Sequence, residues 1–165
     1  MAADVSGSPF GEDVDWDRFD GPADYRPESV PDALWAVARA GSESTGLHAY
    51  NSMLDAVGHN HSGGLYPAAE GAIDPLMAIA LGQAEIETST NWGQWAALEV
   101  LIDMLGGFGA VAHWDTDPAG GGMDARMHAK ALSYVPLLKA MADSAGDSRV
   151  AEQVRVLVAD SLEIE

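Results

Sequence analysis

The sequence predicts an all-α protein, built as a short solenoid of about three helical hairpins. Two observations carry this prediction: apolar residues recur at three- and four-residue steps along most of the chain, and a proline follows an apolar run in two separate helical segments. Each hairpin leaves an apolar face that only a neighbouring hairpin can cover, so such pairs stack side by side. We divide the chain into an acidic N-terminal segment, residues 1–28, and one helical-repeat domain, residues 29–165.

Composition excludes several classes of protein. The 165 residues are enough for one domain with its own core, and 47% of them are hydrophobic, which is not typical of a disordered chain. There is no run of about 18 apolar residues, and residues 1–11 contain no Lys or Arg, so neither a transmembrane helix nor the usual secretory signal is predicted. The absence of cysteine removes disulfides and thiol chemistry. We expect a cytoplasmic protein.

The charge of the chain is strongly negative. The formal net charge is −18, from 26 acidic and 8 basic residues. Such a surface repels phosphate backbones and anionic lipids, so binding to nucleic acid or membranes is disfavoured and a basic protein partner is favoured. Acidity that serves solubility or salt adaptation explains the same composition, and that alternative stays open.

The N-terminal segment mixes acids with aromatic residues. Five acidic residues surround Trp16 and Phe19 between positions 12 and 20, and Tyr25 follows. A disordered acidic tail rarely contains such residues. We therefore expect these aromatic side chains to hold the segment against the first helical pair, and the alternative is an interaction segment that docks on a partner.

The first hairpin has the weakest pattern of the three. Pro31 suits the first turn of a helix that extends over residues 30–40. Trp35 belongs to this helix and is expected in its buried face. A second helix, residues 45–57, follows after a short turn.

The second hairpin begins after a glycine turn. Pro67 suits a first helical turn, where its missing N–H has no partner anyway, and apolar residues line one helical face from Ala69 to Ala80. Pro75 lies inside this pattern, where a proline removes a hydrogen bond at a cost of about 3 kcal/mol. We expect one kinked helix, and two short helices that meet at Asp74 are the alternative.

The third hairpin repeats this plan. Pro136 follows an apolar run as Pro75 does, inside one helix expected from about 124 to 142. In both pairs an amphipathic second helix follows. The inward-facing residues of these second helices are Trp95, Leu98, Leu101, Ile102 and Leu105 in one, and Val150, Val154, Leu157, Val158 and Leu162 in the other.

The paired helices, the two prolines and the well-patterned second helices resemble the HEAT-repeat superfamily. The turn Gly63-Gly64-Leu65-Tyr66-Pro67-Ala68 is also similar to one in a group of small bacterial helical proteins. The resemblance covers residues 30–162. It implies a right-handed solenoid of HEAT-like hairpins whose concave face binds a protein. The chain departs from the usual repeat in the middle pair, where Trp95 stands in place of an arginine that ties neighbouring repeats.

We expect the partner to bind a polar, acidic ridge formed by the second helices. Glu99 and Asp103 lie four residues apart and therefore share a helix face, opposite the apolar stripe. Equivalent polar positions occur on the other second helices, and a long loop before the third hairpin adds two acids. The predicted partner-binding residues are Asn51, Asp55, Glu99, Asp103, Glu152, Asp115 and Asp117.

The function that follows is non-enzymatic binding of a basic protein. Small acidic helical proteins in bacteria are often antidotes to basic toxin domains, so an immunity-type inhibitor is the sharpest form of this hypothesis. No catalytic residue and no cofactor are predicted, because the sequence has no Gly-x-Ser-x-Gly elbow, no cysteine and no phosphate-binding glycine loop.

Two alternatives remain open. A small metal-dependent enzyme would use imidazole and carboxylate groups, which suit zinc, manganese or iron, although their spacing matches no metal signature. Its ligands would come from two loops: His59, His61, His113, Asp115 and Asp117. A structural oligomerisation module would instead place Trp92, Trp95 and Phe108 in a subunit contact.

Overall fold

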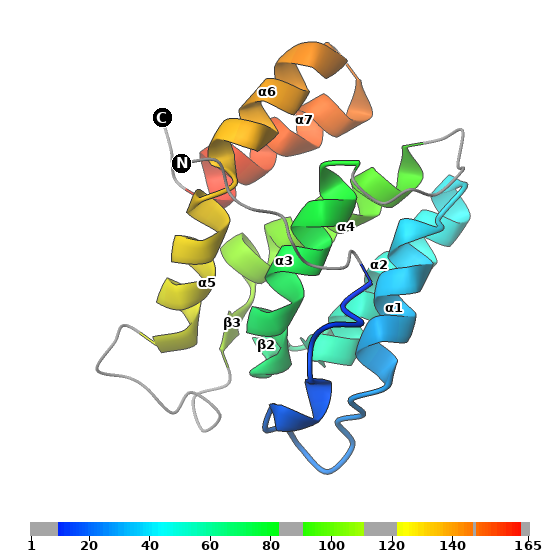
Figure 1. Cartoon of the computed structure of the whole chain (residues 1–165), viewed down its shortest axis with the longest axis vertical. Helices are drawn as coiled ribbons and strands as arrows, with labels where there is room; N and C mark the ends of the chain where they lie inside the picture. Colours follow the sequence, from blue (N-terminus) through cyan, green and yellow to red (C-terminus); the bar gives the residue numbers. More distant parts are fainter. Residues whose placement is uncertain (1–9, 83–90, 111–121, 147, 163–165) are drawn as a thin grey trace.

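A computed structural model shows a mostly helical protein (Figure 1). It describes residues 10–82, 91–110, 122–146 and 148–162. The α-helices in these ranges are α1 (Ser29–Ala38), α2 (Glu43–Val57), α3 (Ala68–Ala80), α4 (Trp92–Ile102), α5 (Gly122–Leu132), α6 (Val135–Ala145) and α7 (Arg149–Val156). The shorter elements are a 3₁₀ turn (Trp16–Arg18), π-helical turns (Asp103–Gly107 and Leu157–Ser161) and the two-residue strands β1 (Gly58–His59), β2 (Gly64–Leu65) and β3 (Gly109–Ala110). The all-α class is confirmed.

Three pairs of helices that follow one another in the chain are packed together. Helix α1 packs on α2, α3 packs on α4, and α6 packs on α7. Between pairs, α2 contacts α4, α4 contacts α7, and α1 contacts α3. The second helix of each pair therefore lies beside the second helix of the next.

One hydrophobic core runs through all three pairs. Its members come from every α-helix, with Trp16 added from the N-terminal segment. The five residues expected on the inward face of the last helix are all buried, including those in the π-helical turn that follows α7. Among the described residues, no helix has the combination of length and apolarity that a bilayer span requires.

Helix α3 is one continuous helix with Pro75 inside it. The alternative of two short helices that meet at Asp74 is therefore wrong. The proline ring is buried, so its apolar surface contributes to the core and offsets part of the lost hydrogen bond.

The single helix expected from 124 to 142 is divided in two, because α5 ends at Leu132 and α6 begins at Val135. Pro136 lies in the first turn of α6, where its missing N–H has no cost. The Ser133 hydroxyl donates to the Lys130 carbonyl at 2.7 Å and competes with the helical pattern. The two prolines that look equivalent in sequence thus occupy different positions in their helices.

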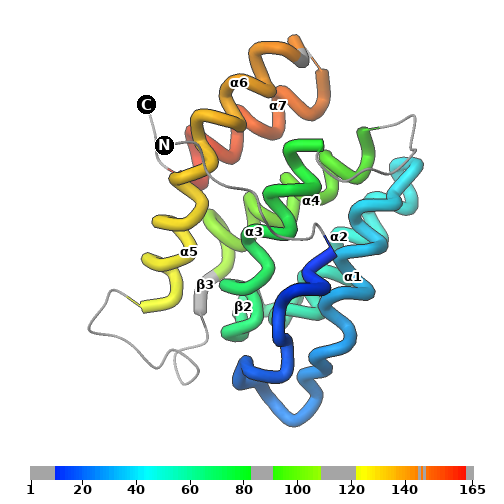
Figure 2. Tube along the Cα trace, in the orientation of Figure 1, coloured from blue at the N-terminus to red at the C-terminus, as the bar shows by residue number. Residues whose placement is uncertain are grey.

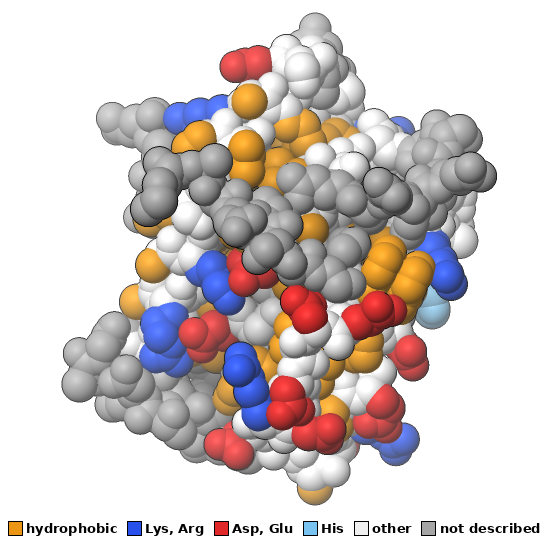
Figure 3. Space-filling view, viewed as in Figure 1, with side chains coloured by type: hydrophobic (Ala, Val, Ile, Leu, Met, Phe, Trp, Pro, Cys, Tyr) orange, Lys and Arg blue, Asp and Glu red, His pale blue; other side chains and the backbone are white. Residues whose placement is uncertain are grey.

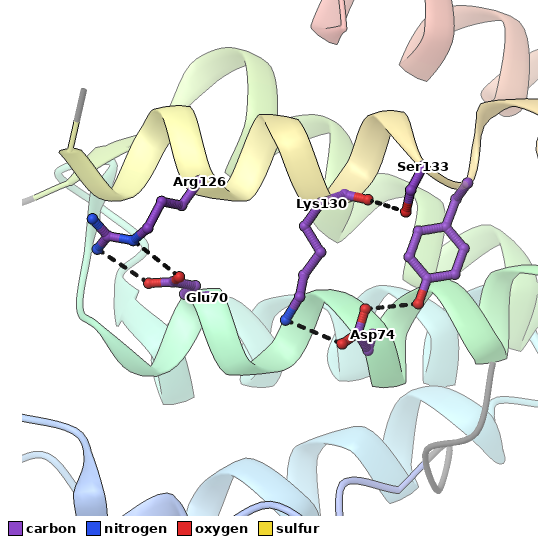
Figure 4. Close-up of polar contacts among 6 residues, drawn as sticks. Glu70, Asp74, Arg126, Lys130 and Ser133 are labelled. Atoms are coloured by element: carbon purple, nitrogen blue, oxygen red, sulfur yellow. Dashed lines mark hydrogen bonds and ion pairs between the residues drawn. The ribbon is translucent and has the colours of Figure 1, made fainter. Parts of the chain in front are cut away.

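Four side chains join α3 to α5, as Figure 4 shows. Glu70 and Asp74 lie four residues apart on α3, and Arg126 and Lys130 lie four apart on α5. The Arg126 guanidinium donates to both Glu70 oxygens at 3.1 and 3.2 Å, and Lys130 Nζ lies 3.0 Å from Asp74 Oδ2. Partly exposed pairs of this kind contribute about 0–1 kcal/mol each. Their main effect is to fix the register of α5 on α3.

The N-terminal segment is packed on the helices through its aromatic residues. Trp16 is only 6% exposed, and its Nε1–H donates to the Gly11 carbonyl at 2.9 Å. Both Trp16 and Phe19 lie against Gly71 of α3, where an added Cβ would come within 2.7 Å of the Phe19 ring. The Tyr25 hydroxyl donates to the Trp16 carbonyl at 3.0 Å. Figure 2 shows the segment, in dark blue, beside α1 on the side towards α3.

Trp35 also contacts the N-terminal segment, and the prediction that it lies in the core is wrong. Its ring is half-buried and stacks on Phe10, with 3.5 Å between the ring centroids. The Arg39 guanidinium also lies over the Trp35 ring, 4.0 Å from its centroid. The core-facing side of α1 is formed by Val30, Leu34 and Val37 instead.

Candidate functional site

The predicted ridge residues occupy the second helices, but they differ in exposure. Asp55 on α2 and Glu152 on α7 are exposed, and Glu152 pairs with Arg155 at 3.3 Å. Asn51 is half-buried and accepts a hydrogen bond from the Asn60 amide at 3.0 Å. Only part of the ridge is therefore open to a partner.

Glu99 and Asp103 are tied into a half-buried polar cluster between α2, α4 and α7. The Tyr50 hydroxyl donates to Asp103 Oδ2, and Glu99 is hydrogen-bonded to Gln153. Burial, and then the Asp103 carboxylate, raise the pKa of Glu99, while the bond to Gln153 lowers it. Burial, followed by the hydrogen bond to Asp103, also raises the pKa of Tyr50. These acids hold second helices together within the chain.

Replacing Glu99 by glutamine is expected to make the protein more stable than wild type at pH 7, by less than about 1 kcal/mol because the side chain is half exposed. The raised pKa means that folded Glu99 keeps its proton to higher pH than the unfolded chain does. Its contribution to stability is therefore full below the ordinary pKa of 4.5 and is lost as pH rises through the folded pKa.

Urea unfolding at pH 4 and pH 7 checks this expectation. The advantage of Glu99→Gln should disappear at pH 4, where Glu99 is protonated in both states. Asp143→Asn, at an exposed position on α6, is the matched control. An advantage of Glu99→Gln that grows on acidification would contradict the assigned pKa direction.

Only part of the predicted metal-ligand set falls in the described residues. His59 lies in β1 and His61 in the turn that follows it, and both are exposed. His113, Asp115 and Asp117 lie outside the residues that the structure describes, so their places in the metal set and in the partner surface stay predictions. Within the described ranges, no group of three or more His, Asp or Glu side chains has the geometry to hold a metal ion.

A polar cleft of about 650 Å³ lies where the N-terminal segment meets the end of α2 and the β1–β2 turn. Tyr66 is one of its lining residues and is only 4% exposed. The Tyr66 hydroxyl is 2.7 Å from His59 Nε2, and the two rings meet edge to face at 5.0 Å. The Tyr25 ring meets Tyr66 in the same manner at 6.4 Å. The rings of Tyr25, His59 and Tyr66 therefore form one aromatic part of an otherwise polar wall.

The short strands position His59 at this cleft. Strands β1 and β2 pair antiparallel, with His59 opposite Gly64, and β2 pairs parallel with β3. Gly63 in the connecting turn has φ of +69°, a conformation that glycine adopts without strain. Gly58 has no room for a side chain, since a Cβ there would lie 2.2 Å from the Gly64 carbonyl oxygen. The glycine turn expected from the sequence thus becomes a small hairpin.

Two carboxylates from different elements converge on the cleft. Asp24 comes from the N-terminal segment and Asp55 from α2, and both line the cleft and are exposed. Neither forms a hydrogen bond or ion pair with another described residue. Burial raises the pKa of the Tyr66 phenol, and Asp24 and then Asp55 raise it further. Arg26 also lines the cleft, so the fixed charges there are two negative and one positive.

An acidic strip adjoins the cleft. We use this name for the five exposed or solvent-facing acids of the N-terminal segment: Glu12, Asp13, Asp15, Asp17 and Asp20. None of them forms an ion pair with another residue in the described part of the chain. Figure 3 shows acidic side chains gathered over the N-terminal segment and α1 on this face of the molecule.

The aromatic residues considered for a subunit contact are engaged within the chain. Trp92 and Trp95 meet edge to face at 5.5 Å, and the Arg149 guanidinium lies 3.7 Å from the Trp92 ring centroid. Phe108 is half-buried and packs against the core. Their role in oligomerisation stays a prediction.

Comparison of the chain with family models, with characterised proteins and with solved structures gives no match. The site therefore has to be interpreted from its own geometry. Asp55 was predicted in a partner surface, and His59 and His61 in a metal site. Tyr66 and Asp24, which line the same cleft, were not predicted as site residues. The position of Tyr66 directly after the glycine turn was the one sequence feature that could have indicated its place in the cleft.

Proposed function

We propose that the chain is a non-enzymatic scaffold that binds a basic protein partner. The observation that supports this proposal most directly is the acidic strip, whose five carboxylates have no ion-pair partner among the described residues. Trp16 is buried beneath them and holds the segment on the core. Like charges fixed close together repel one another, and a cationic partner relieves that repulsion. Such a surface also accelerates encounter with a basic protein.

The architecture that we propose for this scaffold is a short right-handed solenoid of HEAT-like hairpins. The contacts of α2 with α4 and of α4 with α7 support it, because they place successive second helices side by side. Helix α5 is an additional element that packs on α3. An immunity-type inhibitor of a toxin domain, acting in the cytoplasm, is the finer form of the proposal, and the charge and size of the chain are what favour it.

The partner surface that we propose differs in emphasis from the ridge expected from the sequence. Glu99 and Asp103 are half-buried in a cluster with Tyr50 and Gln153. Desolvated charges that already have partners gain little from a new one. The exposed acids of the strip, together with Asp55 beside the cleft, are the groups best placed to meet a basic surface.

A partner captured from the source organism tests the proposal when its affinity is measured with matched charge variants. The strip variant carries Asp13→Asn, Asp15→Asn and Asp17→Asn. The control carries Glu43→Gln, Asp143→Asn and Asp160→Asn, which are also exposed and change the net charge by the same amount. Calorimetry should show affinity for the basic partner falling about tenfold in the strip variant and less than about twofold in the control.

Two results would contradict the proposal. Either no basic protein is retained even at low salt, or the strip variant and the control lose the same affinity. The second result would mean that overall charge, and not this surface, attracts cations. Raising the salt concentration to about 0.5 M should weaken the specific complex, because exposed charges are screened over a few ångströms.

A further inference from the structure

The polar cleft has the features of a receptor for one cationic side chain. Asp24 and Asp55 reach it from two elements that are distant in sequence, and both carboxylates are exposed and have no partner among the described residues. Aromatic rings also line the cleft: the Tyr25 ring is half-buried and the His59 ring is exposed, whereas the Tyr66 ring is only 4% exposed. Tyr25 and His59 each meet the Tyr66 ring edge to face, so the buried Tyr66 ring helps to hold the two more exposed rings in place.

This combination suits a guanidinium better than an ammonium. A guanidinium is planar, stacks on aromatic rings and donates two parallel hydrogen bonds to a carboxylate. It is also less strongly hydrated than the ammonium of lysine, so it enters a partly aromatic cleft with a smaller loss of hydration. A cleft of about 650 Å³ has ample volume for an arginine side chain and part of its peptide backbone.

We propose that this cleft receives the guanidinium of an arginine from the basic partner, bound by Asp24 and Asp55 beside the Tyr25 and His59 rings. The inference rests on the proposed function, and it adds the site that anchors one arginine side chain of the partner. The acidic strip attracts the partner, and the cleft selects one of its side chains. An arginine that is anchored in a pocket of its partner is typical of the few residues that dominate the affinity of a protein interface.

Replacing Arg26 distinguishes a site for a cation from a site for an anion. It is exposed and lines the same cleft, so its positive charge opposes the entry of a second cation. Removing that charge should tighten binding of an arginine probe. If the cleft instead held an anion, Arg26 would be its ligand and the same variant would abolish binding.

The experiment titrates the purified full chain with N-acetyl-arginine methylamide and follows binding by NMR. The matched probes are the citrulline analogue, which keeps the shape without the charge, and the lysine analogue. The arginine probe should bind with a Kd on the order of millimolar and shift signals of Tyr25, His59 and Tyr66, with the lysine analogue weaker by about threefold and citrulline not bound.

Three variants and a control complete the test. Asp24→Asn and Asp55→Asn should each weaken arginine binding by about threefold or more, and Arg26→Gln should strengthen it by about twofold. Asp143→Asn, an exposed change on α6 with the same loss of charge, should leave it unchanged. Thermal unfolding of each variant checks that the fold is retained.

Several outcomes would overturn the inference. These are equal binding of arginine and citrulline, equal loss in Asp55→Asn and Asp143→Asn, or binding of inorganic phosphate that Arg26→Gln abolishes. Failure of the cleft is distinguishable from failure of the proposed function. If the partner's affinity falls in the strip variant but not in the Asp24→Asn, Asp55→Asn double variant, the scaffold function stands and the arginine anchor does not.

Discussion

Replacing Trp16 by alanine is expected to lower the free energy of unfolding by about 3–5 kcal/mol, as for other buried aromatic residues. The indole is only 6% exposed and belongs to the main core, and its N–H bond to the Gly11 carbonyl closes the loop before it. Its ring also fills the space over Gly71 of α3. Because the native stability of a domain is about 5–15 kcal/mol, this one change removes a large fraction of it.

Urea unfolding followed by circular dichroism measures this loss. Trp16→Phe is the informative companion, because it keeps most of the buried ring but cannot donate to Gly11, so we expect a smaller loss of about 1–2 kcal/mol. In Trp16→Ala the acidic strip should also lose affinity for the basic partner, since its carboxylates are no longer held in place. A Trp16→Ala protein as stable as wild type would show that the segment is not part of the core.

The helices themselves were predictable because their signals are local. Pro67 at a first turn, the apolar steps of α3 and the stripe of α7 each follow from neighbouring residues in sequence, and the structure has helices in all these places. The interior Pro75 was also placed correctly in one helix.

The features that sequence reasoning missed depend on contacts between distant segments. The break between α5 and α6 reflects Tyr134, whose hydroxyl donates to Asp74 on α3 at 2.7 Å, together with the position of Pro136. The pairing of Glu70 with Arg126 joins residues 56 positions apart. Trp35 was expected inside because its neighbours are apolar, yet Phe10 from the N-terminal segment covers it. The hydrophobic pattern of a single segment does not show which distant residue will contact it, so these contacts could not be predicted.

The candidate site was predictable only in pieces. Asp55 was expected in an acidic partner surface and His59 in a metal site, and the structure brings both to one cleft. Asp24 joins them only because Trp16 and Tyr25 dock the N-terminal segment beside the end of α2. The convergence is a consequence of tertiary packing, so it could not be derived from the spacing of the residues.

Replacing Gly93 by alanine is expected to destabilise the protein by about 2 kcal/mol, although alanine is the better helix former. Gly93 lies in the first turn of α4, where the end of α1 comes so close that a Cβ would lie 2.8 Å from the Val37 carbonyl oxygen and 2.9 Å from that of Ala38. These neighbours are backbone atoms, which no rotamer change can move. The gain in helix propensity, about 1 kcal/mol, is smaller than the cost of separating the two helices.

Gly41→Ala is the matched control for this prediction. Gly41 is exposed, and the nearest atom to an added Cβ is 4.0 Å away, so the change should alter stability by less than about 0.5 kcal/mol. Thermal unfolding should then show Gly93→Ala melting about 4–8 °C below wild type and Gly41→Ala close to it. A Gly93→Ala protein that melts above wild type would mean that α1 and α4 separate easily, and the close crossing would then contribute little to the packing of the first two hairpins.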